Sequence, residues 1–186
     1  MAKAPAGKKS EEKKKKSKTP KISVKGESAN ELMNQIEEAI SHRQILDLLG
    51  RFSEAADAFE PDLMNGLYWA DAEVKTGIFS GAASDFVDFL AKEIADGIEV
   101  SQHLLGVPKI EISGDQPTAE NPSSGFFRIK AGSGAFEKLT GQTPAQGADA
   151  HEVMVGAAYS DVLERRKGEW RIREHRSMKG WMRILQ

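Results

Sequence analysis

The chain has 186 residues, a length typical of one domain, and its 26 basic and 28 acidic residues give a formal net charge of −2. The absence of cysteine excludes a disulfide scaffold, a thiolate zinc site and catalysis by a cysteine nucleophile. No apolar run approaches the roughly 20 residues of a membrane span. The basic N-terminus is not followed by the apolar segment of a secretory signal, so we expect a cytoplasmic protein without a membrane partner.

The charge is divided unevenly along the chain. Residues 1–25 have a net charge of +8, whereas residues 26–186 have a net charge of −10. We expect a disordered Lys-rich tail over residues 1–27 and one α+β domain over residues 28–186. The tail is either a solubilising extension or a weak electrostatic attachment to nucleic acid. The tail lacks aromatic and arginine side chains that could stack on bases, which favours the solubilising extension. The acidic body repels a polyanion, so we expect no other contact with nucleic acid.

Helices are predicted in the first half of the domain. Capping-box patterns at Ser28–Glu31 and Ser41–Gln44 mark two helix starts, and apolar residues recur at three- and four-residue intervals from Ile45 to Phe59. The further elements expected in this half are a short helix over 61–69, a strand over 72–79 and a third helix over 85–96, which Gly97 ends.

Strands are predicted in the second half, where apolar and polar residues alternate. The expected strands cover residues 98–105, 109–113, 125–130, 152–166 and 169–176, and the last two form a hairpin at Lys167-Gly168. Residues 131–150, which are rich in glycine, alanine and glutamine, are expected to form a loop. Helices followed by antiparallel strands predict an α+β fold with helices on one face of a curved sheet.

Three segments carry a resemblance to a known family: residues 51–74, 101–115 and 156–172. In this order, and over about residues 30–185, the chain resembles the SnoaL-like branch of the nuclear transport factor 2-like superfamily. Within that branch it is most similar to scytalone dehydratase, hexachlorocyclohexane dehydrochlorinase and bile acid 7α-dehydratase. The resemblance implies a cone-shaped α+β barrel, in which a curved antiparallel sheet wraps around the N-terminal helices. It also implies a homodimer or homotrimer that uses no cofactor.

The resemblance implies a catalytic pair, in which an aspartate late in the first helix contacts a histidine on a strand. The matching positions are Asp57 and His103. An elimination needs a base with a pKa near neutrality, which histidine supplies, and a carboxylate on one ring nitrogen fixes the tautomer. From the residues alone, Asp57 also fits an exposed helix face and His103 a buried core position. His42, His151 and His175 lie in no motif and are expected at the surface or in loops, and no metal site is expected.

Other positions depart from the family pattern. The family's tyrosine before the aspartate is Phe52 here, and Tyr68 is the expected replacement for its hydroxyl. Either Arg128 stands nearest to the second histidine of scytalone dehydratase, or that histidine has no equivalent in this chain. Arg165 or Arg166 stands nearest to the catalytic arginine of the dehydrochlorinase, and strand alternation directs only one of them inward. The residues expected to bind substrate are Phe52, Trp69, Phe127, Arg128 and Arg166.

The resemblance implies a cofactor-independent lyase or isomerase of the dehydratase type. His103 would remove a proton from a hydrophobic cyclic molecule, such as a steroid, a polyketide or a degraded aromatic compound, while Asp57 orients it. Tyr68 or an arginine would stabilise the developing negative charge. The alternative is a non-catalytic ligand-binding or assembly module of the same fold, which the changed position 52 and the missing second histidine favour. An Asp57 that faces solvent would also favour this module.

Overall fold

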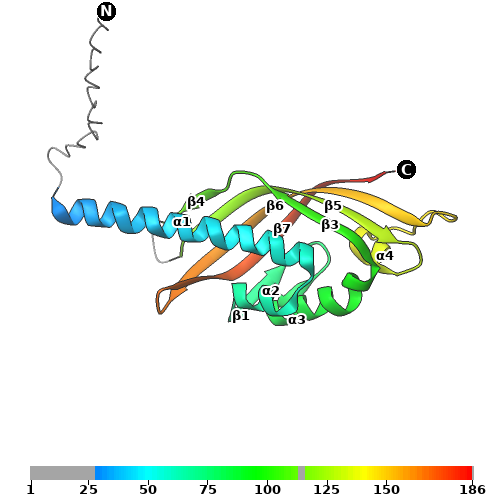
Figure 1. Cartoon of the computed structure of the whole chain (residues 1–186), viewed down its shortest axis with the longest axis horizontal. Coiled ribbons are helices and arrows are strands. Elements are labelled where there is room, and N and C mark those ends of the chain that lie inside the picture. The colour runs from blue at the N-terminus through cyan, green and yellow to red at the C-terminus, as the bar shows by residue number, and fades with distance from the viewer. Residues whose placement is uncertain (1–27, 113–115, 186) are drawn as a thin grey trace, which may run out of the picture.

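The computed structural model describes residues 28–112 and 116–185, and the predicted tail lies outside them (Figure 1). The α+β class predicted from the sequence is confirmed. The elements are, in chain order, α1 (Ala29–Ala58), α2 (Pro61–Leu67), β1 (Tyr68–Lys75), β2 (Ser80–Ala82), α3 (Ala83–Phe89), β3 (Ile98–Leu105), β4 (Lys109–Glu111), β5 (Thr118–Lys130), α4 (Ala135–Thr140), β6 (Ala150–Arg166) and β7 (Glu169–Leu185). No helix in the described part of the chain is long and apolar enough to cross a membrane.

The strands form one curved sheet that lies against the helices (Figure 1). Its order is β2-β1-β7-β6-β5-β3, with β4 paired to β5. Neighbouring strands are antiparallel with one exception: β1 runs parallel to β7. The prediction of a purely antiparallel sheet is wrong at this pair. These two strands are far apart in the sequence, so no hairpin turn requires them to be antiparallel.

Helix α1 is one continuous helix of 30 residues. The predicted capping box is present at Ser28, whose side chain accepts a hydrogen bond from the backbone N–H of Glu31. The second predicted start is wrong, since Ser41 is buried inside the helix. Residues 29–49 contain no glycine or proline that would interrupt the helix. The helix ends where Phe59 adopts a left-handed backbone with a φ of 51°.

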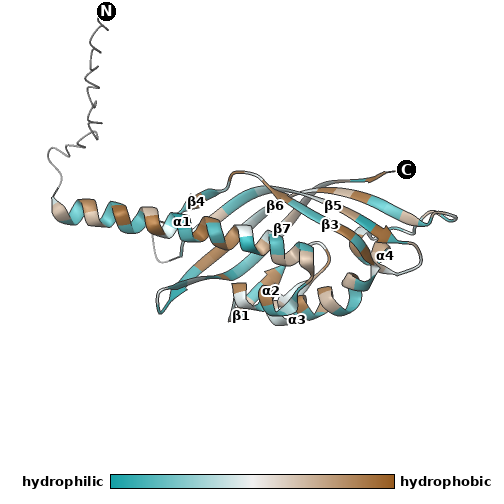
Figure 2. Cartoon of the chain, viewed as in Figure 1, coloured by the Kyte–Doolittle hydropathy of each residue, from teal (hydrophilic) through white to brown (hydrophobic). Residues whose placement is uncertain are grey.

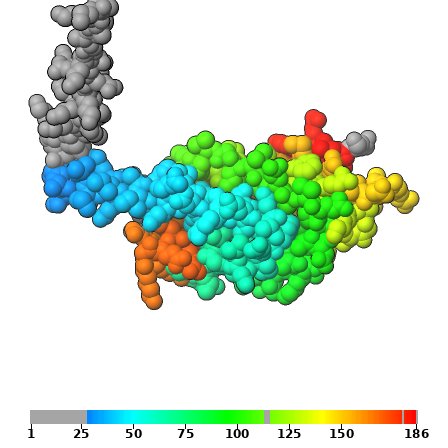
Figure 3. Space-filling view, viewed as in Figure 1, coloured from blue at the N-terminus to red at the C-terminus, as the bar shows by residue number. Residues whose placement is uncertain are grey.

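The two halves of α1 differ in their surroundings. The C-terminal half carries the predicted apolar stripe into the core, where its buried residues are Ile45, Leu48, Leu49, Phe52, Ala55 and Ala56. Burial of each large aliphatic side chain stabilises the fold by about 1.5–3 kcal/mol. The N-terminal half extends past the sheet and stands clear of the body (Figures 1 and 3). It also carries apolar residues, as Figure 2 shows, and Leu32, Met33, Ile36 and Ile40 are 39–54% exposed.

Strand β3 covers the predicted residues, whereas several other elements differ from the prediction. Helix α2 ends at Leu67, so Trp69 belongs to β1 rather than to the helix. The expected loop 131–150 contains α4, and β7 continues nine residues past the predicted end at Arg176, to Leu185. Helix α3 begins one residue before its expected cap at Ser84 and continues as a π turn and a 3-10 turn as far as Gly97.

Strand β5 begins at Thr118, seven residues before its predicted start, and passes through Pro122. A proline inside a sheet removes one ladder hydrogen bond. Here the carbonyl of Pro122 accepts a hydrogen bond of 2.7 Å from the backbone N–H of Gly106, just beyond the last pair of β3 with β5. In an antiparallel sheet the backbone N–H and C=O of one residue point toward the same neighbouring strand. The N–H that Pro122 lacks would therefore point toward the β3 side, and the pairing of β5 with β6 is not interrupted.

Candidate active site

A cavity of about 340 Å³ lies between the helices and the inner face of the sheet. This volume lies within the range of small-molecule sites. Most of its wall is apolar and comes from α1, α3, α4 and strands β5 to β7. The polar side chains in the wall include His103, Ser123, Tyr159, His175 and Ser177.

Asp57 and His103 contact each other at this cavity. Nδ1 of His103 lies 2.6 Å from Oδ1 of Asp57, and the backbone N–H of His103 donates a hydrogen bond of 2.8 Å to Oδ2. The hydroxyl of Ser101 donates a third hydrogen bond, of 2.9 Å, to Oδ1. Ser101 and His103 lie two residues apart on β3 and therefore on one face of the sheet. The two partners meet as the resemblance implies, and Asp57 does not point into solvent.

The contacts of Asp57 fix the protonation of the pair. Burial raises the pKa of Asp57, but the hydrogen bonds and charge of His103 and the hydrogen bond of Ser101 outweigh it, so the pKa lies below its usual value. Asp57 is therefore a carboxylate at neutral pH and holds the proton of His103 on Nδ1. No hydrogen bond reaches Nε2 of His103 from the described residues, so this nitrogen remains for a ligand.

Two of the residues expected to bind substrate line the cavity. Phe127 places its ring edge-on to His103, with 5.4 Å between the ring centroids. Phe52 lies in the same wall and packs against His175 at 4.9 Å. Gly125 lies between His103 and Phe127 in the wall, and a Cβ atom there would meet the Phe127 ring at 2.9 Å. A larger residue here would displace the Phe127 ring, whereas Cδ2 of His103, at 3.6 Å from that Cβ, would be in ordinary contact.

Tyr68 is buried but is not among the residues of the cavity wall. It begins β1, and its ring lies 6.2 Å from that of Phe52. Its hydroxyl has no hydrogen-bond partner in the described part of the chain. Burial and the nearby charge of Asp161 raise its pKa well above the usual value. The tyrosine that lines the cavity is Tyr159, which sequence reasoning missed.

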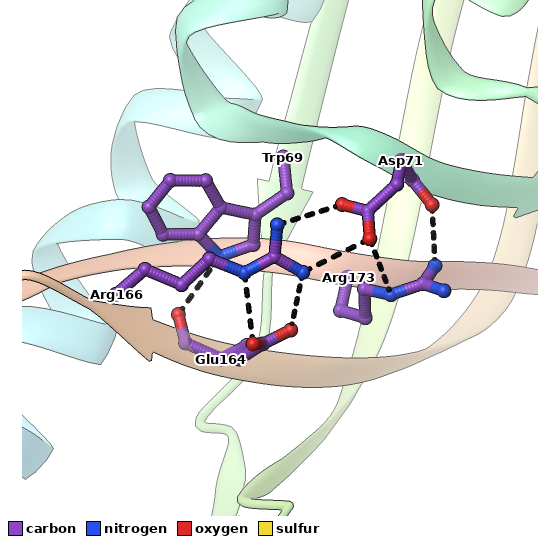
Figure 4. A network of polar contacts seen from close by, with 5 residues as sticks. All are labelled: Trp69, Asp71, Glu164, Arg166 and Arg173. Atoms are coloured by element: carbon purple, nitrogen blue, oxygen red, sulfur yellow. Dashed lines mark hydrogen bonds and ion pairs between the residues drawn. The ribbon is translucent and has the colours of Figure 1, made fainter.

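Trp69 and Arg166 belong to a polar network outside the cavity wall (Figure 4). The Arg166 guanidinium lies 4.8 Å from the centroid of the Trp69 ring and donates hydrogen bonds of 2.9 and 3.1 Å to the Asp71 carboxylate. It also donates two hydrogen bonds to Glu164, whose carbonyl accepts the indole N–H of Trp69. Arg173 donates a hydrogen bond to the Asp71 carbonyl. The network joins β1, β6 and β7.

Arg128 also lies outside the cavity wall. Its guanidinium donates hydrogen bonds of 2.8 Å to Glu99 and 2.7 Å to Glu152, on the neighbouring strands β3 and β6. Successive residues of a strand face opposite sides of the sheet, so Phe127 points inward and Arg128 outward. Arg128 therefore does not replace the second histidine of scytalone dehydratase.

Two histidines differ from the expectation of a surface or loop position. His175 is buried in the cavity wall, and its Nδ1 lies 2.7 Å from Oδ1 of Asp161. His151 is buried on β6 against Phe136, outside the cavity wall. The alternation of β6 and β7 could have indicated that residues 159 and 161 share one face of β6 and that 175 and 177 share one face of β7. The register, which pairs Asp161 with His175 and Tyr159 with Ser177, places all four on the same face of the sheet. In the described residues, no group of three or more histidine, aspartate or glutamate side chains could hold a metal ion.

Comparison with known proteins agrees with this architecture. Residues 37–176 match the family model described as the SnoaL-like domain. A hexachlorocyclohexane dehydrochlorinase, LinA Type2, has a TM-score of 0.67 and 16% identity, over 82% of this chain and 93% of that one. A candidate scytalone dehydratase from Novosphingobium aromaticivorans has a TM-score of 0.62 and 14% identity, over 80% of this chain and 90% of that one.

A nuclear transport factor 2-like protein from Salmonella enterica serovar Typhimurium has a TM-score of 0.60 and 15% identity, over 76% of this chain and 92% of that one. Similarities at this level of identity show the fold, a cone-shaped α+β architecture with a curved sheet around N-terminal helices. Comparison with curated protein sequences finds no match.

Proposed function

This chain belongs to the SnoaL-like domain family, and we propose that it is a lyase or isomerase that removes a carbon-bound proton from a hydrophobic cyclic molecule. The observation that carries the proposal is the 2.6 Å contact between Asp57 and His103 beside an apolar cavity. A histidine whose Nδ1 is held by a carboxylate and whose Nε2 is open to a cavity is equipped as a general base.

The proposed reaction uses the two nitrogens of His103 differently. Nε2 accepts a proton from a carbon next to an electron-withdrawing group, and the electron pair of that C–H bond forms a double bond. A leaving group departs with its own electron pair in a lyase, whereas a second carbon regains the proton in an isomerase. Asp57 stabilises the imidazolium that forms. This assignment uses no cofactor, and the dehydrochlorinase and dehydratase among the structural relatives support the class of reaction.

The cavity supports a hydrophobic cyclic substrate. Its wall is mostly aliphatic and aromatic, and Phe127 stands beside the proposed base. Apolar walls exclude water, which strengthens each electrostatic interaction inside the cavity. A flat or puckered ring of modest size fits a volume of about 340 Å³.

A non-catalytic ligand-binding module is the second candidate. The observation that favours it is Phe52, which has no hydroxyl at the position of the family's tyrosine and packs against other rings instead. Under this alternative the cavity binds an apolar ring without proton transfer.

Proton removal from 5-nitrobenzisoxazole separates the two candidates. This compound is a flat apolar ring that a well-placed base opens to a coloured phenolate. We expect the full chain to open it about 100-fold faster than the variant His103→Gln, which has no base. The matched control is His42→Gln, on the exposed surface of α1, which should keep the activity of the unchanged chain. Equal rates for the unchanged chain and His103→Gln would refute the catalytic proposal and leave the binding module.

A further inference from the structure

The cavity wall contains a second histidine–carboxylate pair, His175 and Asp161. These residues stand opposite each other in the register of β6 and β7, and Nδ1 of His175 lies 2.7 Å from Oδ1 of Asp161. Both side chains are only 3% exposed. His175 lines the cavity, and no hydrogen bond reaches its Nε2 from the described residues. The second pair therefore repeats the arrangement of the first, with one nitrogen held by a carboxylate and the other left for a ligand.

Asp161 is the charged residue that contacts the His175 ring, whereas Glu174 and Arg176, which flank His175 on β7, face the other side of the sheet and pair with each other. Phe52 from α1 packs on the ring at 4.9 Å, and Tyr159 from β6 meets it edge-on at 5.1 Å. Tyr68 from β1 lies close enough for the charge of Asp161 to affect it. Burial raises the pKa of both phenols, so neither carries a charge at neutral pH. A carboxylate buried this deeply needs a hydrogen-bonding or positively charged partner, and the His175 ring is in place to be one.

Tyr159 connects the two pairs in space. Burial raises its pKa most, a hydrogen bond with Ser123 lowers it, and the negative charges of Asp161 and Asp57 add smaller upward shifts. Its ring also lines the cavity. Tyr159 packs on His175 and lines the same cavity as both histidines, which enter it from β3 and from β7. Both imidazoles are therefore in the wall of the cavity that would hold a ligand.

We propose that His175 and Asp161 form a second acid–base pair, in which Nε2 of His175 donates a proton to the substrate oxygen that departs or gains negative charge. This inference rests on the proposed function and narrows the substrate to a ring that carries a hydroxyl or carbonyl oxygen. In a loss of water, His103 accepts the carbon-bound proton, the C–H electron pair forms the double bond, and the C–O bond breaks. The proton from His175 completes the water molecule. Solvent then returns the proton of His103 to His175, so the net change is the loss of one H₂O.

The test compares two probes that differ in their need for an acid. Opening of 5-nitrobenzisoxazole releases a stable phenolate, whereas opening of unsubstituted benzisoxazole releases a more basic one that depends on proton donation. The variant His175→Asn keeps an N–H group near the position of Nδ1 for Asp161 but has no group at Nε2. We expect it to slow the unsubstituted probe by about 100-fold and the nitro probe by less than about 10-fold.

The other variants give distinct patterns. His103→Gln should slow both probes by the same factor, since it removes the base itself. His151→Asn is the matched control, because His151 is a buried histidine on β6 outside the cavity wall, and it should leave the ratio of the two rates unchanged. Equal slowing of both probes by His175→Asn, or no slowing, would overturn the inference and leave the pair a structural link between β6 and β7.

Binding of 4-nitrophenol tests the inference without turnover, so that a failure of the proposed function can be recognised separately. An imidazolium at His175 should bind this probe as its yellow phenolate, and His175→Asn should raise the Kd by about 10-fold or more, as expected for loss of a hydrogen bond to a charged group. The bound colour and the Kd are both read from a titration. Binding as the neutral phenol, or an unchanged Kd in the variant, would contradict the proton-donor role.

Discussion

At the scale of single residues, the candidate site depends on which ring nitrogen each histidine leaves open. Asp57 holds Nδ1 of His103, and Asp161 holds Nδ1 of His175. A carboxylate only accepts hydrogen bonds, so each contact places a proton on Nδ1 and leaves Nε2 for chemistry. His103 could be found from its resemblance to a family position. His175 could not, because its partner lies 14 residues away on another strand and only the strand register joins them.

The lowered pKa of Asp57 predicts a pH-dependent contribution to stability. The folded pKa lies below the unfolded value, so the carboxylate stabilises the fold above the unfolded pKa, and this stabilisation is lost as the pH falls through the folded pKa. The unchanged chain should therefore exceed Asp57→Asn in free energy of unfolding at pH 7, and the difference should shrink below about pH 4. Urea unfolding of both proteins across this range measures it, with Asp96→Asn, an exposed residue, as the control. A difference that stays constant with pH would contradict the prediction.

At the scale of the elements, strand alternation decides which predicted residues reach the cavity. On β5, Phe127 points inward and Arg128 outward, so only one of two adjacent candidates lines the wall. The Arg166 side chain joins Trp69 and Asp71 instead of entering the cavity. A period of two in the sequence shows which side chains share one face of a strand. Which of the two faces lines the cavity depends on where the helices pack.

The Trp69 network predicts a variant that loses stability but not proton abstraction. Trp69→Phe removes the indole hydrogen bond of 3.0 Å to the Glu164 carbonyl and weakens the stacking of Arg166 and Arg171. We expect a loss of about 1–2 kcal/mol in the free energy of unfolding, measured with urea. The rate with 5-nitrobenzisoxazole should remain that of the unchanged chain. A large loss of this rate in a folded variant would instead assign Trp69 to the binding of substrate.

At the scale of the whole molecule, the cone combines an internal cavity with exposed apolar surface. The cavity lies between helices and sheet, whereas the projecting half of α1 leaves Leu32, Met33, Ile36 and Ile40 exposed. Val107, Met178 and Trp181 on and beside the sheet are also 48–91% exposed. Monomeric proteins seldom expose large groups of apolar side chains together. The expected dimer or trimer would cover such surface. The cytoplasmic location is a separate prediction, which the structure does not test.

Light scattering of the purified full chain checks the oligomeric state. We expect a mass of two or three times 20.4 kDa that persists on dilution through the micromolar range. The measurement should be repeated at high salt. Residues 1–25 carry a net charge of +8 and the remainder carries −10, so the tail of one chain could bind the acidic body of another, and salt would screen this attraction. A mass of one chain throughout would contradict the prediction, and an assembly lost only at high salt would assign it to the charged tail.

The sequence by itself determined the α+β class, the helix start at Ser28, the bounds of β3 and the positions of Asp57 and His103. These features follow from local signals, namely caps, periodicity and a motif read in order along the chain. Only the tertiary structure decided that β1 runs parallel to β7, that Tyr159 rather than Tyr68 lines the cavity, and that His175 meets Asp161 there. The physical reason is that strand register and helix packing join residues far apart in the sequence, and local patterns do not specify these contacts.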